Sequence, residues 1–283
     1  MGFSSLDQLN ASLSGGKKQR AWFQKATSNA AASAAGRWHE LFTATGIPAA
    51  GSWSGTTGAA TALSRSSQGA LPLGANVAPE TRHLTKLAAC STTSTVPPAV
   101  LVLCDFLLYY PGCVVTGAPT TLTNPVALPR YSDGVGVQAL VAVQSVLGAA
   151  APALTLSYTD QDGNTGNSAL PVTAPVASAP VSTLFANNGL PFLPLAGPDN
   201  GIRKIDSYTL ATGTTGTVAF VLVRPLVEIP LVALSTMSIA NLVHELPSLE
   251  QVQDDACLGF LLSPGGAMAA GANVFGSVEW AWD

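Results

Sequence analysis

The residue types that carry out catalysis are scarce in this sequence, and none has the spacing of a known motif. His39-Glu40 and His244-Glu245 each begin like a zinc-protease motif, but neither has a second histidine three residues after the glutamate. GSWSG at residues 51–55 lacks the spacing of a GxSxG nucleophile elbow, and GVGV at 134–137 lacks the third glycine of a dinucleotide-binding loop. We therefore predict no catalytic residue, no bound cofactor and no enzymatic activity.

One segment, TDQDGNTGN, has the alternating oxygen atoms that Ca²⁺ prefers, on Asp160, Asp162 and Asn164. Its glycine is at the fourth position instead of the sixth position of a calcium loop, and Pro171 stands where a glutamate is needed. A polar hairpin turn explains the same residues, so the sequence favours a turn over a metal site. No two cysteines form a CxxC pair, and all four are expected to be buried free thiols: Cys90, Cys104, Cys113 and Cys257.

The composition is unusually poor in charge. Of 283 residues, 47% are hydrophobic, which argues against disorder, and only 10% are charged, against about 25% in an ordinary soluble domain. A free monomer needs charge to stay soluble. The surface is therefore either neutral or hidden in an assembly, and we favour the assembly. The apolar runs are too short or too interrupted to span a membrane, and the first residues do not have the pattern of a secretory signal.

The few charges are unevenly distributed along the chain. Residues 1–37 have five basic residues and one acidic residue, whereas after Arg224 all seven charged residues are acidic. This pattern fits a solvated basic helix with an acidic end, head-to-tail contact between copies, or a basic arm that makes weak contact with packaged DNA. The basic residues are too sparse for a nucleic-acid-binding domain.

The first fifty residues are predicted to form a helical arm. Ser4 and Ser5 can cap a short helix that ends at Gly15-Gly16. Further helices are predicted over KKQRAWFQKAT (17–27) and over the alanine-rich NAAASAAGRWHELFTATG (29–46).

Residues 51–283 are predicted to form a β-rich domain, because short β-favouring runs alternate with Gly, Pro, Ser and Thr. The fold class is therefore mainly β, an antiparallel β-sandwich or jelly-roll-like domain with the helical arm before it. GTTG at 213–216 is expected to turn a hairpin, and PVTAPVASAP (171–180) is either a linker, which would set a sub-boundary there, or an extended segment along a sheet edge. The expected strands are 100–109, 138–146, 153–159, 205–210, 217–223, 229–234, 257–262 and 277–282.

All five tryptophans lie near the two ends of the chain. Either the N-terminal helices pack against the last strand, or both ends anchor in neighbouring subunits, because aromatic residues are enriched at the centres of interfaces. If both ends anchor in neighbouring subunits, the candidate interface residues are Lys17, Lys18, Arg20, Trp22, Phe23, Trp38, Phe42, Trp280 and Trp282.

Two segments, GRWHELFTATGIPAAG (36–51) and GIRKIDSYTLATGTTGTVAFVLVRPLVEIPL (201–231), together with the YTDQDG turn, resemble poorly characterised virion structural proteins of tailed bacteriophages. The similarity covers about half of the chain at the level of pattern and carries no catalytic signature. The resemblance implies a virion component that is made in the cytoplasm of the bacterial host and assembled in many copies.

The resemblance leaves several positions in the particle open. A major capsid protein would need a long spine helix, and a fibre would show repeats, and the sequence has neither. We therefore expect a capsid-associated protein, of the decoration or minor capsid type, that binds itself and the major capsid protein; a tail or neck component is the alternative. Less favoured are a glycan-binding module that uses Tyr131, Tyr158 or Tyr208 and a glycan hydrolase, whose paired carboxylates would come from Asp160, Asp162, Asp199 and Asp206.

Overall fold

The protein is built almost wholly of antiparallel strands. The computed structural model describes residues 3–26, 37–92, 98–150, 152–169, 171–173, 179–185, 189–245, 249–265 and 272–283. Two helices, α1 (Leu6–Ser14) and α2 (Leu242–Glu245), are described. The strands are β1 (Lys18–Ala26), β2 (His39–Glu40), β3 (Gly46–Ile47), β4 (Thr61–Ala62), β5 (Arg82–Ser91), β6 (Ala99–Val114), β7 (Thr120–Thr121), β8 (Gln138–Ser145), β9 (Ala153–Asp160), β10 (Asn167–Ser168), β11 (Val172–Thr173), β12 (Ile202–Leu210), β13 (Thr217–Leu231), β14 (Ser238–Asn241), β15 (Leu258–Pro264) and β16 (Asn273–Trp282).

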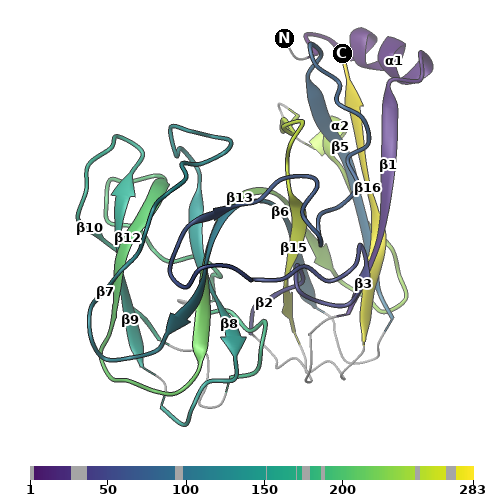
Figure 1. Ribbon diagram of the computed structural model, residues 1–283. Helices are drawn as coiled ribbons and strands as arrows, with labels where there is room; N and C mark the ends of the chain where they lie inside the picture. Colours follow the sequence, from purple (N-terminus) through teal and green to yellow (C-terminus); the bar gives the residue numbers. More distant parts are fainter. Residues whose placement is uncertain are drawn as a thin grey trace.

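Three sheets lie one beside another as layers (Figure 1). The terminal sheet, named for the chain ends that it holds, has the order β14-β5-β16-β1-β3. The central sheet has the order β2-β15-β6-β13-β8, and the lateral sheet has the order β10-β9-β12-β7. These antiparallel sheets confirm the predicted mainly β, sandwich-like fold class.

The long strands β6 and β13 hold the two halves of the molecule together. Near Leu101 and Ile229 this pair packs against the terminal sheet, in a core that includes Trp280. Near its other end, at Tyr110 and Phe220, it packs against the lateral sheet. A third core lies around Trp53 and Phe106, between the central sheet and the segment that follows β2. Two layered cores thus share one central ladder.

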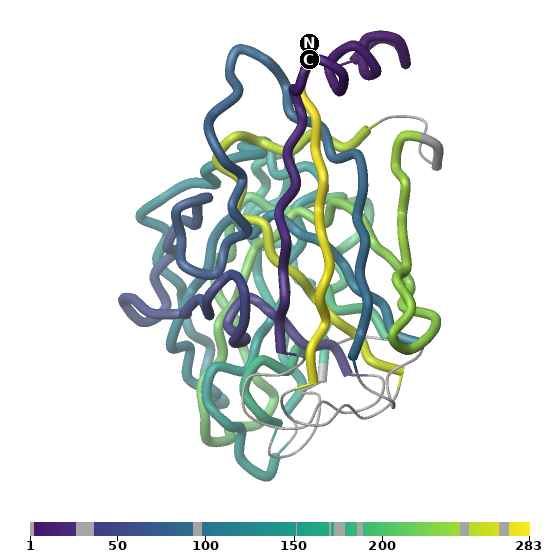
Figure 2. The backbone as a smooth tube through the Cα atoms, turned by 90° about the vertical axis from the view of Figure 1, so that its right-hand side faces the viewer, coloured from purple at the N-terminus to yellow at the C-terminus, as the bar shows by residue number. Residues whose placement is uncertain are grey.

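The predicted helical arm is wrong beyond its first helix. Helix α1 is present as expected, with the backbone N–H of Gln8 donating to the Ser5 hydroxyl. Residues 18–26, predicted as helix, form β1, which lies between β16 and β3; β1 and β16 run side by side in Figure 2. Residues 37–46 contain β2 and β3 and no helix, and 27–36 lie outside the described residues.

The physical reason is tertiary pairing. Strand β1 pairs with β16 along its whole length, and Ala21 and Phe23 enter the same core as β16. These ladder hydrogen bonds and this burial outweigh the helix propensity of lysine, glutamine and arginine. Strands β1, β2 and β3 are therefore built into the sheets rather than set apart as an arm, and the packing of the N-terminal segment on the last strand is by strand pairing.

Most predicted strands are present, with two differences. Residues 217–223 and 229–231 belong to one strand, β13, because β6 pairs with it from Thr217 to Leu231. The pairing of β13 with β8 ends at Val223. Beyond that point β13 is an edge strand, where Pro225 and Pro230 cost no ladder hydrogen bond on the open side. The predicted GTTG hairpin is wrong, since β12 and β13 lie in different sheets. Part of the 171–180 segment, Val172–Thr173, pairs with β9, and 174–178 lie outside the described residues.

Candidate interaction surface

The outer face of the terminal sheet exposes apolar side chains in a cross-strand row. Trp22 of β1 lies opposite Ser277, which lies opposite Ala88, which lies opposite Ile239 of β14. Residues directly opposite one another share a face of a sheet, so these four side chains form one row. Trp22 is 60% exposed and Ile239 is 54% exposed, whereas the small side chains between them are buried. We call this set the Trp22 row; no strand of the described chain covers it.

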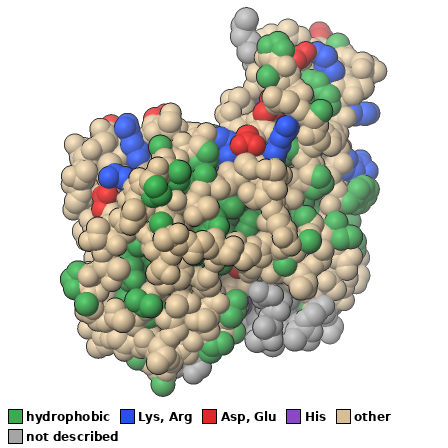
Figure 3. Space-filling view, viewed as in Figure 1, with side chains coloured by type: hydrophobic (Ala, Val, Ile, Leu, Met, Phe, Trp, Pro, Cys, Tyr) green, Lys and Arg blue, Asp and Glu red, His purple; other side chains and the backbone are tan. Residues whose placement is uncertain are grey.

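A basic row lies beside the Trp22 row. Glu279 lies between two cations, with its carboxylate 2.6 Å from the Arg20 guanidinium and 3.6 Å from the Lys86 ammonium. Lys18 lies further along the same face and has no ion-pair partner among the described residues. The Arg20 guanidinium also lies 5.2 Å from the centroid of the Trp22 ring. Figure 3 shows basic and hydrophobic side chains next to one another along the edge of the molecule that β1 forms.

The nine candidate interface residues do not share one surface. Lys17, Lys18, Arg20 and Trp22 lie on the outside, with Lys17 held by Glu80 (3.4 Å) and by the backbone carbonyl of Asp283 (2.7 Å). The others are core or nearly so: Phe23 against Phe260, Phe42 against Trp53, Trp280 fully buried, Trp38 almost buried and Trp282 partly buried. The prediction that Phe23, Phe42 and Trp280 contact a neighbouring subunit is therefore wrong, because their rings fill the protein's own core.

The sequence alone did not identify three further residues of this surface, Lys86, Glu279 and Ile239. Alternation of side chains along β1 is the only local signal, and it becomes readable once that segment is known to be a strand. Ile239 and Lys86 reach the row through pairings between distant segments of the chain, and no spacing in the sequence indicates them.

The strongest buried ion pair, which the sequence also did not indicate, supports the fold and not this surface. Arg130 donates to both oxygens of Asp105, at 2.9 and 2.7 Å, and also to the carbonyl oxygens of Leu63 and Phe106. The backbone N–H of Cys257 donates to Asp105 at 2.8 Å. With these partners, the charges of both side chains are balanced without water.

A second buried polar group lies between β1 and the segment that follows β2. The Lys25 ammonium donates to the carbonyl oxygens of Ala44 (3.1 Å) and Ala49 (3.4 Å), and burial lowers its pKa to about 8 although Glu40 acts in the opposite direction. Glu40 accepts from the backbone N–H (2.9 Å) and the hydroxyl of Thr43, and burial raises its pKa. The adjacent His39 ring is buried, and its two nitrogens have no hydrogen-bond partner in the described chain. The side chains of Lys25, His39 and Glu40 are all buried.

The Asp160 segment forms the turn that the sequence favours. One Asp160 oxygen accepts from the backbone N–H groups of Asp162 and Asn164, at 2.9 and 2.8 Å, and the other accepts from the side-chain amides of Asn164 and Asn167. Burial acts to raise the pKa of Asp160, but these hydrogen bonds outweigh it and lower the pKa. No cluster of side chains suited to a metal ion is found among the described residues.

Replacing Asp160 by alanine is expected to lower the melting temperature by a few degrees, because four donors lose their acceptor. The matched control is Asp162→Ala, since Asp162 is exposed and its carboxylate accepts from Gln161 alone among the described residues. The control is expected to stay within about 2 °C of the unchanged protein. Equal shifts in calorimetry would show that the Asp160 carboxylate does not hold the turn.

The glycan-binding and hydrolase alternatives lose most of their candidate residues. Tyr158 and Tyr208 are buried, so their rings are not available to stack on sugars. Of the acidic candidates, Asp199 accepts from the Tyr158 hydroxyl at 2.6 Å and Asp206 pairs with Lys204 at 3.1 Å. The hollow of about 520 Å³ beside Arg203 and Lys204 has no carboxylate among the described residues that line it. The paired carboxylates of a glycosidase are thus not assembled there.

The four cysteines are buried free thiols, as expected. Burial raises the pKa of Cys113 to about 12 and raises the pKa values of Cys90, Cys104 and Cys257. Thiols held in the neutral form are poor nucleophiles and poor metal ligands. Among the described residues, no helix is long and apolar enough to cross a membrane.

Comparisons with known proteins give little. No family model matches the chain, and no curated protein matches it. The solved structures that match include a subviral particle of VP2 from infectious bursal disease virus, at 8% identity over 94% of this chain and 81% of that chain, with a TM-score of 0.20. The Gt strain of the same virus matches at 10% identity over 94% and 80%, with a TM-score of 0.18. Likeness at these TM-scores carries no argument about function. The argument about function therefore rests on the residues of the candidate interaction surface.

Proposed function

We propose that this chain is a bacteriophage virion structural protein, made in the bacterial cytoplasm, that associates with copies of itself and with the major capsid protein. The observation that carries the proposal is the Trp22 row, in which Trp22 and Ile239 are exposed on one sheet face, with a basic row beside it. The low charge content and the resemblance to tailed-phage virion proteins support the same class.

The chemistry of the Trp22 row suits a protein contact. Tryptophan and arginine are the residues most enriched at interface positions that dominate binding energy. Here they adjoin, with Arg20 over the Trp22 ring, and only the small side chains of Ser277 and Ala88 lie between Trp22 and Ile239. Contact with packaged DNA is not part of this proposal, because Lys25 is buried and Lys17 already pairs with Glu80.

Trp22→Ala is expected to weaken self-association by about 2 kcal/mol, or about 30-fold in Kd, because truncating a central aromatic contact costs that much. The free energy of unfolding of the monomer is expected to change by less than about 0.5 kcal/mol, since the ring is largely exposed. Sedimentation velocity over a range of concentrations measures the first, and urea unfolding measures the second.

The control is Val146→Ala, which truncates an apolar side chain that is 57% exposed and outside the terminal sheet. It is expected to leave association unchanged. An unchanged protein that stays monomeric at every concentration would overturn self-association. Binding to the capsid is tested separately, by co-sedimentation with shells that lack this protein; failure of the unchanged chain to sediment with them would remove the capsid from the proposal.

A further inference from the structure

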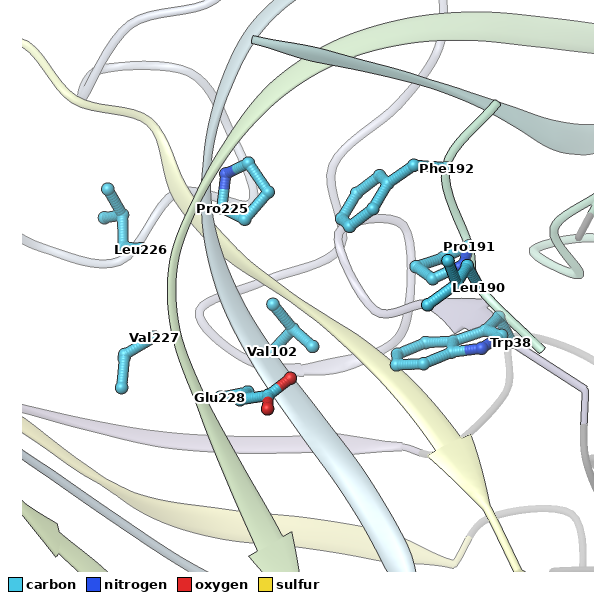
Figure 4. A pocket seen from close by; sticks show the side chains of 9 residues that line it. All are labelled: Trp38, Val102, Leu190, Pro191, Phe192, Pro225, Leu226, Val227 and Glu228. Atoms are coloured by element: carbon cyan, nitrogen blue, oxygen red, sulfur yellow. The ribbon is translucent and has the colours of Figure 1, made fainter. Parts of the chain in front are cut away.

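A second surface, an apolar groove, lies against strands β6 and β13 of the central sheet (Figure 4). Its volume is about 260 Å³, with Trp38, Leu190 and Phe192 on one side, Pro225 on the other, and Val102 and Glu228 between them. This is smaller than the roughly 300–1,000 Å³ of pockets that bind small molecules, and it is close to the size of a side chain. The groove is therefore suited to a single large residue.

The groove is open because β13 is an edge strand at this point. The β8 pairing ends at Val223, and the register between β13 and β6 shifts between Pro225 and Val227. The wall is fixed on the opposite side, where the Trp38 indole N–H donates to the carbonyl oxygen of Gly189 at 2.5 Å. Leu190 at the rim is 63% exposed. The groove is thus built by folded elements and leaves apolar surface in water.

One charged group marks the groove. Glu228 is exposed, and no ion pair or hydrogen bond of its carboxylate is found within the described chain. An apolar hollow with a free carboxylate at its rim complements an exposed aromatic residue that has a cation beside it. On the described surface, Trp22 with Arg20 is such a pair.

We propose that Trp22 of one copy inserts into this groove of a second copy, so that Arg20, which also pairs with Glu279 of its own chain, faces the second copy's Glu228. This inference rests on the proposed function and names the contact by which copies associate. Trp22 points away from the central sheet, because the opposite face of β1 packs on that sheet. A chain therefore cannot fill its own groove. The contact joins two different surfaces and generates a ring or an open row of subunits.

The charges favour this head-to-tail contact over a symmetric one. If β1 paired with β1 of another copy along residues 18–23, which β3 leaves unpaired, Lys18 and Arg20 of both chains would share one sheet face, and like charges on neighbouring strands are destabilising. In the head-to-tail contact, the basic surface meets an acidic rim. Complementary charge of this kind selects the partner surface.

Disulfide trapping tests the contact. Gln24 is exposed on the same face of β1 as Trp22, so the variants Gln24→Cys and Leu190→Cys each put one thiol beside a proposed surface and keep Trp22. The native thiols are buried and do not compete. Under mild oxidation, a mixture of the two variants is expected to form a disulfide-linked dimer, and each variant alone is not. A mixture of Val146→Cys with Leu190→Cys is the control for random collision.

Four outcomes separate this inference from the proposed function. Linkage in the mixture alone supports the head-to-tail contact. Linkage of Gln24→Cys with itself at the same rate overturns it in favour of a symmetric contact. Self-association without linkage in the mixture also overturns it, while the proposed function stands; a protein that is monomeric throughout overturns both.

A charge exchange gives a second, independent readout. Glu228→Arg is expected to weaken self-association at least about 10-fold, and Arg20→Glu is expected to do the same. Mixing the two variants places opposite charges at both contacts that unlike copies can form, and it is expected to recover hetero-association. Both positions are exposed or partly exposed, and melting curves verify that each variant folds. Failure of the mixture to recover would show that Glu228 and Arg20 do not meet.

Discussion

Replacing Asp105 by alanine is expected to lower the free energy of unfolding by about 3–5 kcal/mol, because it leaves the Arg130 guanidinium buried without its counter-charge. The Arg130 guanidinium donates hydrogen bonds to both oxygens of Asp105 and to the carbonyl oxygens of Leu63 and Phe106. The same change also removes the acceptor of the Cys257 backbone N–H. Urea unfolding at pH 7 measures the loss.

The control is Asp255→Ala. The Asp255 carboxylate lies 3.8 Å from the same guanidinium, but its side chain is 59% exposed, so its removal is expected to cost less than about 1 kcal/mol. A double change, Asp105→Leu with Arg130→Met, removes both charges and is expected to recover most of the loss. If the Asp105 and Asp255 variants unfold at the same urea concentration, the buried pair does not hold the central sheet.

Strand positions were predictable where the pattern is local. Leu154 to Thr159 alternate apolar and polar residues, and they form β9 with the expected inward and outward faces. The run 218–223 is apolar throughout and lies inside the central sheet between β6 and β8. Both patterns depend only on the two-residue period of a strand and on burial of one face or both.

Strand β1 was not predictable in the same way. KKQRAWFQKA consists largely of residues that favour helices, and its partner β16 lies more than two hundred residues further along the chain. Its alternation of inward Ala21 and Phe23 with outward Arg20 and Trp22 is short enough to be read as either structure. The pairing with β16 decides the outcome, and pairing over that separation leaves no local signal.

The residues of the candidate surface also depend on pairing between distant segments. Trp22 and Trp280 belong to neighbouring strands, and the register sets Trp22 opposite Ser277 and Trp280 opposite Gln19. These positions are one residue out of phase, so one indole faces water and the other is fully buried. The positions of the tryptophans near the chain ends indicated candidate contact residues. Only the strand register separates a contact residue from a core residue.

The second large effect concerns acid stability. Burial lowers the pKa of His39 to about 4, from about 6.5 in an unfolded chain. Between these values the unfolded chain binds a proton that the folded protein does not, so stability falls as the pH falls from 6.5 to 4. The His39 share of the loss between pH 7 and pH 4.5 is about 2–3 kcal/mol. Glu40 has the opposite sign, since its raised pKa makes the folded state bind the extra proton.

His39→Leu is therefore expected to remove about 2–3 kcal/mol of the difference in unfolding free energy between pH 7 and pH 4.5, measured by urea unfolding at each pH. Glu40→Gln is the control of opposite sign: it removes a group that stabilises the protein on acidification, so its acid loss is expected to be steeper than that of the unchanged chain. Lys25 does not interfere, because its lowered pKa of about 8 confines its effect to alkaline pH, where stability rises as the pH rises. Parallel pH curves for the unchanged protein and His39→Leu would show that the ring accepts a proton in the folded state as readily as in the unfolded chain.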